Sequence, residues 1–149
     1  FANSKGSMFL GRGYSYPIAL EGALKLKELA YVHAEGYPAG EMKHGPLALI
    51  EEGMPVVVIA PRDEHYKKTI SNMQEVISRG AKVLLITNKS TDEIYSENIW
   101  EQIEVDAISD ELIPFLTTIP LQKLAYYSAL DKGYDIDKPR NLAKSVTVE

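Results

Sequence analysis

The stretch PVVVIAPRDEHYKKTISNMQEVISRGAKVLLIT, residues 55–87, decides the fold class. It begins with PVVVIA, an apolar and largely β-branched run that is typical of a strand covered on both faces. Residues 63–79 then carry apolar side chains at helical spacing, and Gly80 stands where helices commonly end. The stretch closes on KVLLIT, residues 82–87, a second run of the buried kind. A strand, a helix and a strand in this order predict a parallel βαβ unit.

Weaker signals on either side extend this unit. Ser15 is a candidate N-cap, with Pro17 in the first turn of the helix that follows. We expect strands over residues 8–10 and 99–105, helices from residue 15 to about residue 31 or 33 and over residues 110–131, and a loop over residues 34–45. Strands that alternate with helices predict an α/β protein, a three-layer sandwich with a parallel sheet between helices. The tail after residue 136 has no apolar period, so we divide the chain into a domain, residues 1–136, and a tail, residues 137–149.

Composition excludes several classes of protein. A chain of 149 residues with 45% hydrophobic and 25% charged residues is long enough for one domain with a real core. The net charge of −5 and the lack of a long Lys/Arg block speak against a nucleic-acid partner. No apolar run approaches ~18 residues, so we expect no membrane span. The chain begins with Phe1 rather than Met and has no signal peptide, which suggests a piece of a longer protein.

The absence of cysteine removes further chemistry. Without cysteine there is no disulfide, no thiolate nucleophile and no Cys-ligated metal, and a cytoplasmic location is expected. His33 and His44 lack the spacing of metal ligands, so we expect neither a metal site nor a cofactor. His44 lies in a segment rich in glycine and charge. It is either a surface or capping histidine or a general acid/base that titrates near neutral pH.

A charged seam marks the helix that starts near Ser15. Glu21, Lys25 and Glu28 follow one another at i, i+4 and i+7, which places them in a stripe ~60° wide on an otherwise mostly apolar helix. On a solvated face such a stripe is a ladder of ion pairs worth only ~0.2–0.5 kcal/mol each. The stripe is narrow, which favours a site instead. There burial is expected to raise the pKa of a glutamate and lower that of a lysine, bringing both nearer neutrality.

Anion-binding motifs are weak. Gly11-Arg12-Gly13 allows a tight turn from strand to helix, but the full dinucleotide-binding pattern is absent because residue 16 is tyrosine. The segments that follow the two buried strands, residues 60–64 and 88–93, carry carboxylates rather than a Ser/Thr/Gly cradle. Lys144, in the uncharged run NLAKSVTV, is either a solvated tail lysine or a desolvated one that attacks a carbonyl.

Two motifs together resemble one family. EGALKLKELAYVHAEGYPAGEMKHGPLALI, residues 21–50, and DKPRNLAKSVTVE, residues 137–149, are similar to the carboxy-terminal isomerase lobe of the glucosamine-6-phosphate synthases, the isomerising glutamine:fructose-6-phosphate aminotransferases. The resemblance runs from residue 9 to the end. It implies the sugar isomerase (SIS) fold, a five-stranded parallel sheet flanked by helices, and the conversion of fructose 6-phosphate and glutamine to glucosamine 6-phosphate and glutamate.

The resemblance also implies roles for individual residues. Lys144 resembles the lysine that forms a Schiff base with the open-chain ketose, and Ala143 a residue whose backbone touches the sugar. Glu28 resembles the carboxylate that moves a proton between C1 and C2, with Lys25 as a second proton-transfer residue. His44 resembles the histidine that opens the sugar ring from the neighbouring subunit, which implies a homodimer.

The family also has parts that this sequence does not match. Ammonia comes from a glutaminase domain, and a first SIS lobe holds the sugar phosphate with a Ser/Thr-rich loop. We therefore expect this lobe alone to be inactive. Two alternatives remain: a SIS module that senses a sugar phosphate without catalysis, and a simple aldose–ketose isomerase. The tail lysine argues against the latter, since direct enediol chemistry needs no Schiff base.

Overall fold

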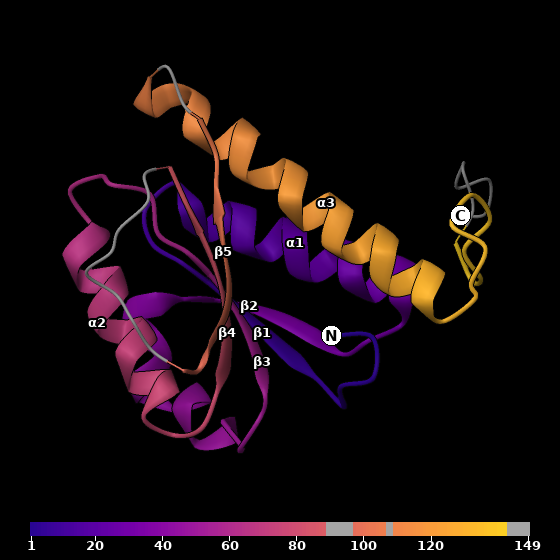
Figure 1. Ribbon diagram of the computed structural model, residues 1–149, viewed down its shortest axis with the longest axis horizontal. Helices are drawn as coiled ribbons and strands as arrows, with labels where there is room; N and C mark the ends of the chain where they lie inside the picture. The colour runs from indigo at the N-terminus through magenta and orange to yellow at the C-terminus, as the bar shows by residue number, and fades with distance from the viewer. Residues whose placement is uncertain (89–96, 107–108, 143–149) are drawn as a thin grey trace, which may run out of the picture.

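The computed structural model describes residues 1–88, 97–106 and 109–142. Its elements are β1 (Ser7–Gly11), α1 (Ser15–Ala30), β2 (Ala34–Pro38), the 3-10 helices η1 (Ala39–His44) and η2 (Pro46–Leu49), β3 (Pro55–Ile59), α2 (Tyr66–Ile77), β4 (Lys82–Thr87), β5 (Ile99–Glu104), the 3-10 turn η3 (Asp110–Leu112) and α3 (Ile113–Asp131). The strands of the described residues form one five-stranded parallel sheet in the order β2-β1-β3-β4-β5 (Figure 1).

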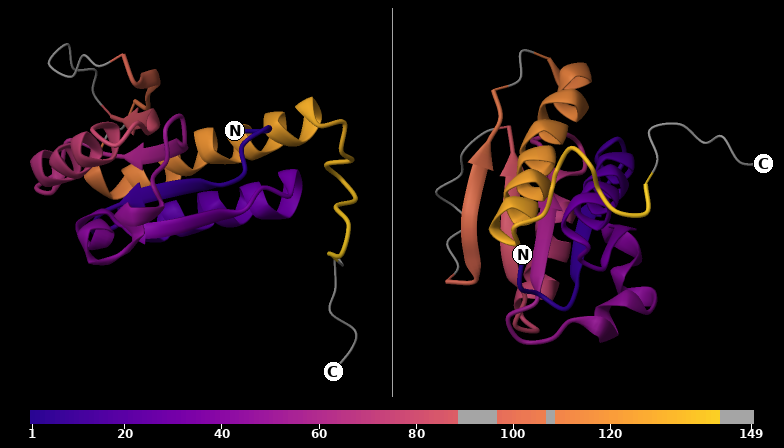
Figure 2. Two further views of the ribbon diagram at one scale, coloured as in Figure 1. Left: turned by 90° about the horizontal axis from the view of Figure 1, so that it is seen from below. Right: turned by 90° about the vertical axis from the view of Figure 1, so that its right-hand side faces the viewer.

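Helices cover both faces of this sheet, which confirms the predicted three-layer α/β fold. Helices α1 and α3 lie side by side on one face, and α2 lies across the sheet from them (Figures 1 and 2). Successive residues of a strand point to opposite faces, so the central strands feed two cores. The core under α1 and α3 includes Phe9, Val57, Ile86, Leu26 and Leu121. The core under α2 and η1 includes Leu10, Val58, Leu85, Met73 and Met42.

The βαβ unit of residues 55–87 is present as predicted. Strands β3 and β4 are buried along almost their whole length and pair in parallel, with Val57 opposite Leu84. Helix α2 is shorter than its apolar spacing suggested and covers Tyr66–Ile77. Gly80 follows it with φ +90°, a conformation that suits glycine. Alternation between strand and helix therefore identified the centre of the sheet correctly.

Strand β2 is a correction, because we expected a loop over residues 34–45. It pairs in parallel with β1 at the edge of the sheet, with Gly36 opposite Phe9. The sequence AEGYP hides this strand, since glycine and proline are depleted in strands and only Ala34 is buried. Gly36 serves packing: a Cβ there would come within 2.9 Å of backbone atoms of Leu20 in α1. The edge strand thus lets α1 lie close to the sheet.

Ser15 does not cap α1, contrary to expectation. The helix begins at Ser15 itself, and Tyr14 takes the cap position without a side-chain hydrogen bond. The backbone N–H groups of Ser15 and Tyr16 donate instead to the carbonyls of Arg12 and Gly13. The tight turn after β1 therefore satisfies the first donors of the helix.

The long apolar helix near the end of the chain is also present. It starts with the short turn η3, and α3 proper runs over 19 residues with Pro114 in its first turn. Pro120 lies inside α3 and is buried against the sheet side of the helix. None of the helices in the described residues is long and apolar enough to cross a lipid bilayer.

The strand order creates a switch point between β1 and β3. From β1 the chain passes into α1 on one face, and from β3 it passes into α2 on the other. In open α/β sheets, ligands bind in the crevice outside the carboxyl ends of two such strands. The loops that follow β1 and β3 therefore border this crevice.

Candidate active site

The charged seam of α1 is a compact cluster. Lys25 Nζ donates a hydrogen bond of 2.6 Å to Glu28 Oε2 and lies 3.6 Å from Glu21 Oε1. Helix geometry brings the three together, because residues three and four positions apart are neighbours on a helix surface. The side chains of Lys25 and Glu28 are 29% and 27% exposed, and that of Glu21 is 40% exposed. Lys25 and Glu28 are thus the inner pair, and Glu21 lies nearer the solvent.

The pKa of Lys25 is shifted in the direction opposite to the one that we expected. The hydrogen bond from Lys25 to Glu28 raises the pKa of the lysine above its ordinary value, and Glu21 adds to the effect. Burial acts in the opposite direction but is outweighed. The expected lowering of this lysine's pKa is therefore wrong for the lobe described. Lys25 is a firm cation at neutral pH, and it holds the Glu28 carboxylate by a charge-assisted hydrogen bond.

The surroundings of the seam are more open than an apolar helix suggested. Leu20 and Leu24 are 43% and 41% exposed, although both belong to the apolar part of the helix. The residues that do face the sheet and α3 are small or central to the core: Ala19, Gly22, Ala23, Leu26 and Ala30. One side of α1, which carries the seam, therefore remains available to a ligand or to another part of a larger protein.

The beginning of the carboxy-terminal tail is fastened to the end of α1. Tyr31, the residue that ends this helix, has φ +54° and accepts a hydrogen bond of 2.7 Å from the backbone N–H of Arg140. The Arg140 guanidinium carbon lies 4.1 Å from the centre of the Tyr31 ring. Tyr134 packs against Tyr31 from the other direction, with ring centres 4.8 Å apart. Figure 2 shows the tail passing the ends of α1 and α3.

Lys132 ties α3 to the same place. Its Nζ donates a hydrogen bond of 2.8 Å to the carbonyl of Ala30, one of the last carbonyls of α1. A cation at this end of a helix is favourable, because the carbonyls there carry partial negative charge. The ends of α1 and α3 and the start of the tail thus form one joint, three residues beyond Glu28.

Ala143 and Lys144 lie outside the described residues, which end at Leu142. Their predicted contact with substrate and the predicted Schiff base therefore stay predictions.

His44 is not brought to the seam within this chain. Its Nδ1 lies 2.7 Å from Glu41 Oε2, and its side chain is 72% exposed. It ends η1, which packs through Met42 into the core on the α2 face, whereas α1 covers the opposite face. His44 therefore has access to solvent and to other molecules, but not to Lys25 and Glu28 of its own lobe.

The described residues show no metal centre. No group of three or more His, Asp or Glu side chains converges among them. His33 has one acidic neighbour, with Nε2 3.5 Å from Glu35 Oε1. Glu35 also accepts a hydrogen bond from Tyr37, which raises the pKa of that tyrosine to about 12. These groups stabilise β2 locally and do not form a second seam.

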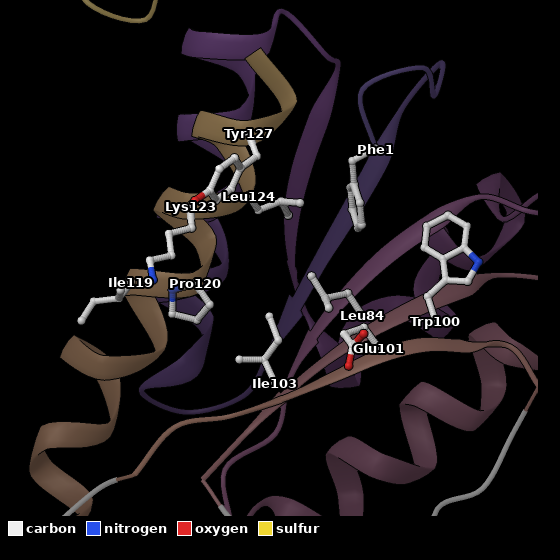
Figure 3. Close-up of a pocket in the computed structure, with 10 residues that line it drawn as sticks. All are labelled: Phe1, Leu84, Trp100, Glu101, Ile103, Ile119, Pro120, Lys123, Leu124 and Tyr127. Carbon is white, nitrogen blue, oxygen red and sulfur yellow. The ribbon is translucent and has the colours of Figure 1, made fainter. Parts of the chain in front are cut away.

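An apolar hollow lies between α3 and the edge of the sheet (Figure 3). Its volume is about 570 Å³, and Leu84, Trp100, Ile103 and Leu124 form much of its wall. Glu101 and Lys123 are its only charged lining residues among those described. A hollow with so few convergent polar groups is a poor candidate for sugar chemistry, which needs many hydrogen-bonding partners.

The sequence reasoning missed the residues of the joint. The sequence patterns singled out none of Tyr31, Lys132 and Arg140. Arg140 follows Tyr31 by 109 residues and Lys132 follows Ala30 by 102, so no local spacing reveals these contacts. The positive φ of Tyr31 carries no signature in the sequence either, since glycine is the usual residue there.

Comparisons with known proteins point in one direction. A model of the SIS domain family matches residues 1–131. The chain is 55% identical over 147 residues to glutamine–fructose-6-phosphate aminotransferase (isomerizing) of Bartonella henselae, which covers 99% of this chain and 24% of that protein. The counterpart from Aquifex aeolicus is 54% identical over 149 residues, covering 100% of this chain and 25% of that protein. The chain thus spans about a quarter of the length of these curated relatives.

The fold is also similar to that of a solved structure of the same kind of protein. The C-terminal domain of glucosamine-fructose-6-phosphate aminotransferase from Francisella tularensis superposes with a TM-score of 0.87 at 50% identity, covering 93% of this chain and 39% of that one. The sheet and its flanking helices are therefore those of that domain, and the predicted SIS fold is confirmed.

Proposed function

The chain belongs to the SIS domain family, and from this premise we propose that it is the second isomerase lobe of an enzyme that makes glucosamine 6-phosphate from fructose 6-phosphate and glutamine. The observation that carries the proposal is the hydrogen-bonded pair Lys25–Glu28 on the open side of α1. The names and the 54–55% identity of the relatives support it.

Lys144 is the proposed nucleophile. Its amine adds to the C2 carbonyl of the open-chain ketose and, with loss of water, gives a protonated Schiff base. It lies four positions after Arg140, a span of at most about 14 Å in an extended chain. The contact of Arg140 with Tyr31 starts this span at the end of α1, close to Glu28. In the proposal, Ala143 touches the sugar through its backbone. Ammonia then adds at C2 and releases the lysine, which leaves an imine of the ketose.

Glu28 performs the proposed isomerisation. Its carboxylate takes a proton from C1, which the C2 imine makes acidic, and returns a proton to C2. The imine nitrogen takes up one proton and O1 gives one up as C1 becomes a carbonyl, so the product is an isomeric 2-amino aldose. Lys25 is the second proton-transfer residue in this proposal. Because its pKa is raised, it acts first as a cationic donor that orients Glu28.

The remaining parts of the proposal lie outside this lobe. His44 opens the sugar ring in the site of a partner subunit, which requires a homodimer, and its 72% exposure suits this role. Ammonia comes from a glutaminase domain, and the phosphate is held by a first SIS lobe. The lobe by itself is inactive because it lacks both. A phosphorylated sugar does not cross a lipid bilayer unaided, so the proposal includes a cytoplasmic location.

The test uses the full-length protein and separates its two half-reactions. Glu28→Gln and Lys144→Ala should lower glucosamine 6-phosphate formation by about 10²–10⁴-fold, while glutamine hydrolysis stays measurable. Glu21→Gln is the matched control, because it lies in the same seam but is not assigned a proton transfer. It should keep most of the activity.

Two results contradict the proposal. Normal formation of glucosamine 6-phosphate by Lys144→Ala rules out the proposed Schiff base. Equal losses of activity in Glu21→Gln and Glu28→Gln rule out Glu28 as the group that moves the proton. Tight binding of fructose 6-phosphate by the unmodified full-length protein without turnover favours the alternative, a sensor of sugar phosphates.

A further inference from the structure

A carboxylate accompanies His44 at the end of η1. His44 Nδ1 lies 2.7 Å from Oε2 of Glu41, three positions earlier in the chain. An ionised carboxylate can only accept a hydrogen bond, so the proton between the two atoms belongs to the ring nitrogen. In a neutral ring with its proton on Nδ1, the other nitrogen, Nε2, keeps a lone pair. Glu41 therefore determines which nitrogen of His44 can take up a proton.

The backbone beneath this pair is fixed, although both side chains reach the solvent. Met42, which lies between the two residues in the chain, is fully buried in the core under α2. Lys43 Nζ lies 2.9 Å from Glu75 Oε1, and this ion pair ties η1 to α2. The side chains of His44 and Glu41 are 72% and 61% exposed. The pair is thus held at a defined position and remains accessible to another molecule.

The other two histidines of the chain lack this arrangement. His33 meets a carboxylate through Nε2, which lies 3.5 Å from Glu35 Oε1. His65 does the same, with Nε2 3.7 Å from Glu64 Oε1. Among the described residues, His44 alone has its Nδ1 paired with a carboxylate while its Nε2 has no partner. An acidic residue nearby in the sequence therefore does not by itself produce this geometry.

We propose that Glu41 is a positioning residue, which holds His44 with Nδ1 protonated and Nε2 free to accept a proton. This role rests on the proposed function, in which His44 opens the ring of fructose 6-phosphate in the site of a partner subunit. Glu41 also stabilises the positive charge that the imidazole carries while it holds a second proton, because a carboxylate at Nδ1 favours the charged ring.

The ring opening moves one proton between two oxygen atoms of the sugar. Nε2 takes the proton of the C2 hydroxyl group, and C2 becomes a carbonyl. The bond between C2 and the ring oxygen breaks, and its electron pair stays on that oxygen. Nε2 then gives the proton to the ring oxygen, so the histidine returns to its first state. With the proton on Nε2 at the start, the lone pair of Nδ1 would face Glu41 and could not reach the sugar.

The test compares two substrates of the full-length protein at saturating glutamine. Fructose 6-phosphate must open its ring before it reacts, whereas 5-deoxyfructose 6-phosphate lacks the hydroxyl that closes the ring and is always open. Glu41→Gln should lower the turnover of fructose 6-phosphate by about tenfold to a hundredfold, because an amide N–H donates to Nδ1 and favours the wrong tautomer. The turnover of the open-chain substrate should stay unchanged, whereas a purely structural role of Glu41 would lower both.

Three further variants complete the experiment. Glu41→Asp keeps a carboxylate and should lose less turnover of fructose 6-phosphate than Glu41→Gln does. Glu51→Gln is the matched control, because it changes an exposed carboxylate that follows η2, and it should keep the turnover of both substrates. His44→Gln should show the same selective loss as Glu41→Gln. Unchanged melting temperatures show that the variants fold.

The results for Glu41→Gln and His44→Gln separate this role from the proposed function. Parent turnover of fructose 6-phosphate by Glu41→Gln, or an equal loss on both substrates, overturns the role of Glu41. If His44→Gln then loses only the turnover of fructose 6-phosphate, the proposed ring opening by His44 stands and the positioning role alone is wrong. If His44→Gln affects the two substrates equally, the proposed ring opening is wrong, and the role of Glu41 is wrong with it.

Discussion

The backbone N–H of Arg140 donates a hydrogen bond to the hydroxyl of Tyr31, 109 residues earlier in the chain, and the Arg140 side chain covers the same ring. The tail therefore meets α1 at a fixed position before it reaches Lys144. This contact places the start of the tail beside Tyr31, three residues beyond Glu28 at the end of α1.

Tyr31→Phe tests this contact, since it removes the hydroxyl and keeps the ring. A hydrogen bond contributes about 1 kcal/mol, so the Arg140 amide should exchange with solvent about fivefold faster. Hydrogen exchange followed by NMR measures this rate. Tyr127→Phe removes the hydroxyl of a tyrosine that lines the apolar hollow instead, and it should leave the Arg140 amide unchanged. Identical exchange in Tyr31→Phe and the parent protein contradicts the prediction.

Gly36→Ala tests the close approach of α1 to β2. The new methyl group would lie 2.9 Å from backbone atoms of Leu20, so the helix must move, at a cost of about 1–3 kcal/mol in the free energy of unfolding. Gly6→Ala is the matched control. Its Cβ would meet its nearest neighbour, the His33 carbonyl oxygen, at 3.4 Å, and the change should stay within about 0.5 kcal/mol. Urea unfolding measures both, and equal midpoints for the two variants contradict the packing argument.

The raised pKa of Lys25 gives a prediction in alkaline solution. NMR titration of its side chain should show a pKa above 10.5, which Glu28→Gln lowers more than Glu21→Gln does, because the Glu28 hydrogen bond is the largest cause. A lysine whose pKa is higher in the folded state stabilises the fold fully below its unfolded pKa and loses this effect as the pH rises through the folded value. The stability difference between the parent protein and Lys25→Met should therefore shrink above pH 10.5.

Lys132→Met tests the joint between α3 and α1. The variant loses the hydrogen bond to the Ala30 carbonyl and the charge at the end of α1, for an expected cost of about 1–2 kcal/mol. Lys123→Met changes an exposed lysine within α3 that makes no hydrogen bond to another described residue, and it should be nearly neutral. Thermal unfolding compares the two. Equal melting temperatures argue that the joint adds nothing to stability.

Mixed dimers of the full-length protein test the proposed origin of His44. His44→Gln and Lys144→Ala should each be inactive alone. After the subunits are exchanged, about half of the dimers contain one subunit of each variant. In such a dimer one of the two sites combines an intact Lys144 with an intact His44 from the partner subunit, so about a quarter of the parent activity should return. A histidine that serves its own subunit gives no recovery, and this outcome contradicts the assignment.

The centre of the fold could be predicted because its signal is local. PVVVIA and KVLLIT are apolar on both faces, and only a strand inside a covered sheet needs this. β2 could not be predicted in the same way. Its residues include Gly36 and Pro38, and it is held by pairing with β1 and by the backbone of α1, which are contacts between distant parts of the chain.

In the candidate site, too, the features set by local spacing could be predicted and those set by distant contacts could not. The spacing of Glu21, Lys25 and Glu28 predicted their cluster, because helix geometry alone makes them neighbours. The direction of the pKa change of Lys25 was wrong, since it depends on whether the hydrogen bond or burial prevails, and packing decides that. The contact between Tyr31 and Arg140 had no local signal at all.

Helix α1 has Ser15 at its first residue and Glu28 in its last turn, about 20 Å away. The switch point of the sheet and the charged seam are thus at opposite ends of one helix. A compound bound at the switch point of the sheet would not overlap with a sugar at the seam. Sugar phosphate would therefore not displace such a compound, and the two could be bound to one chain at the same time.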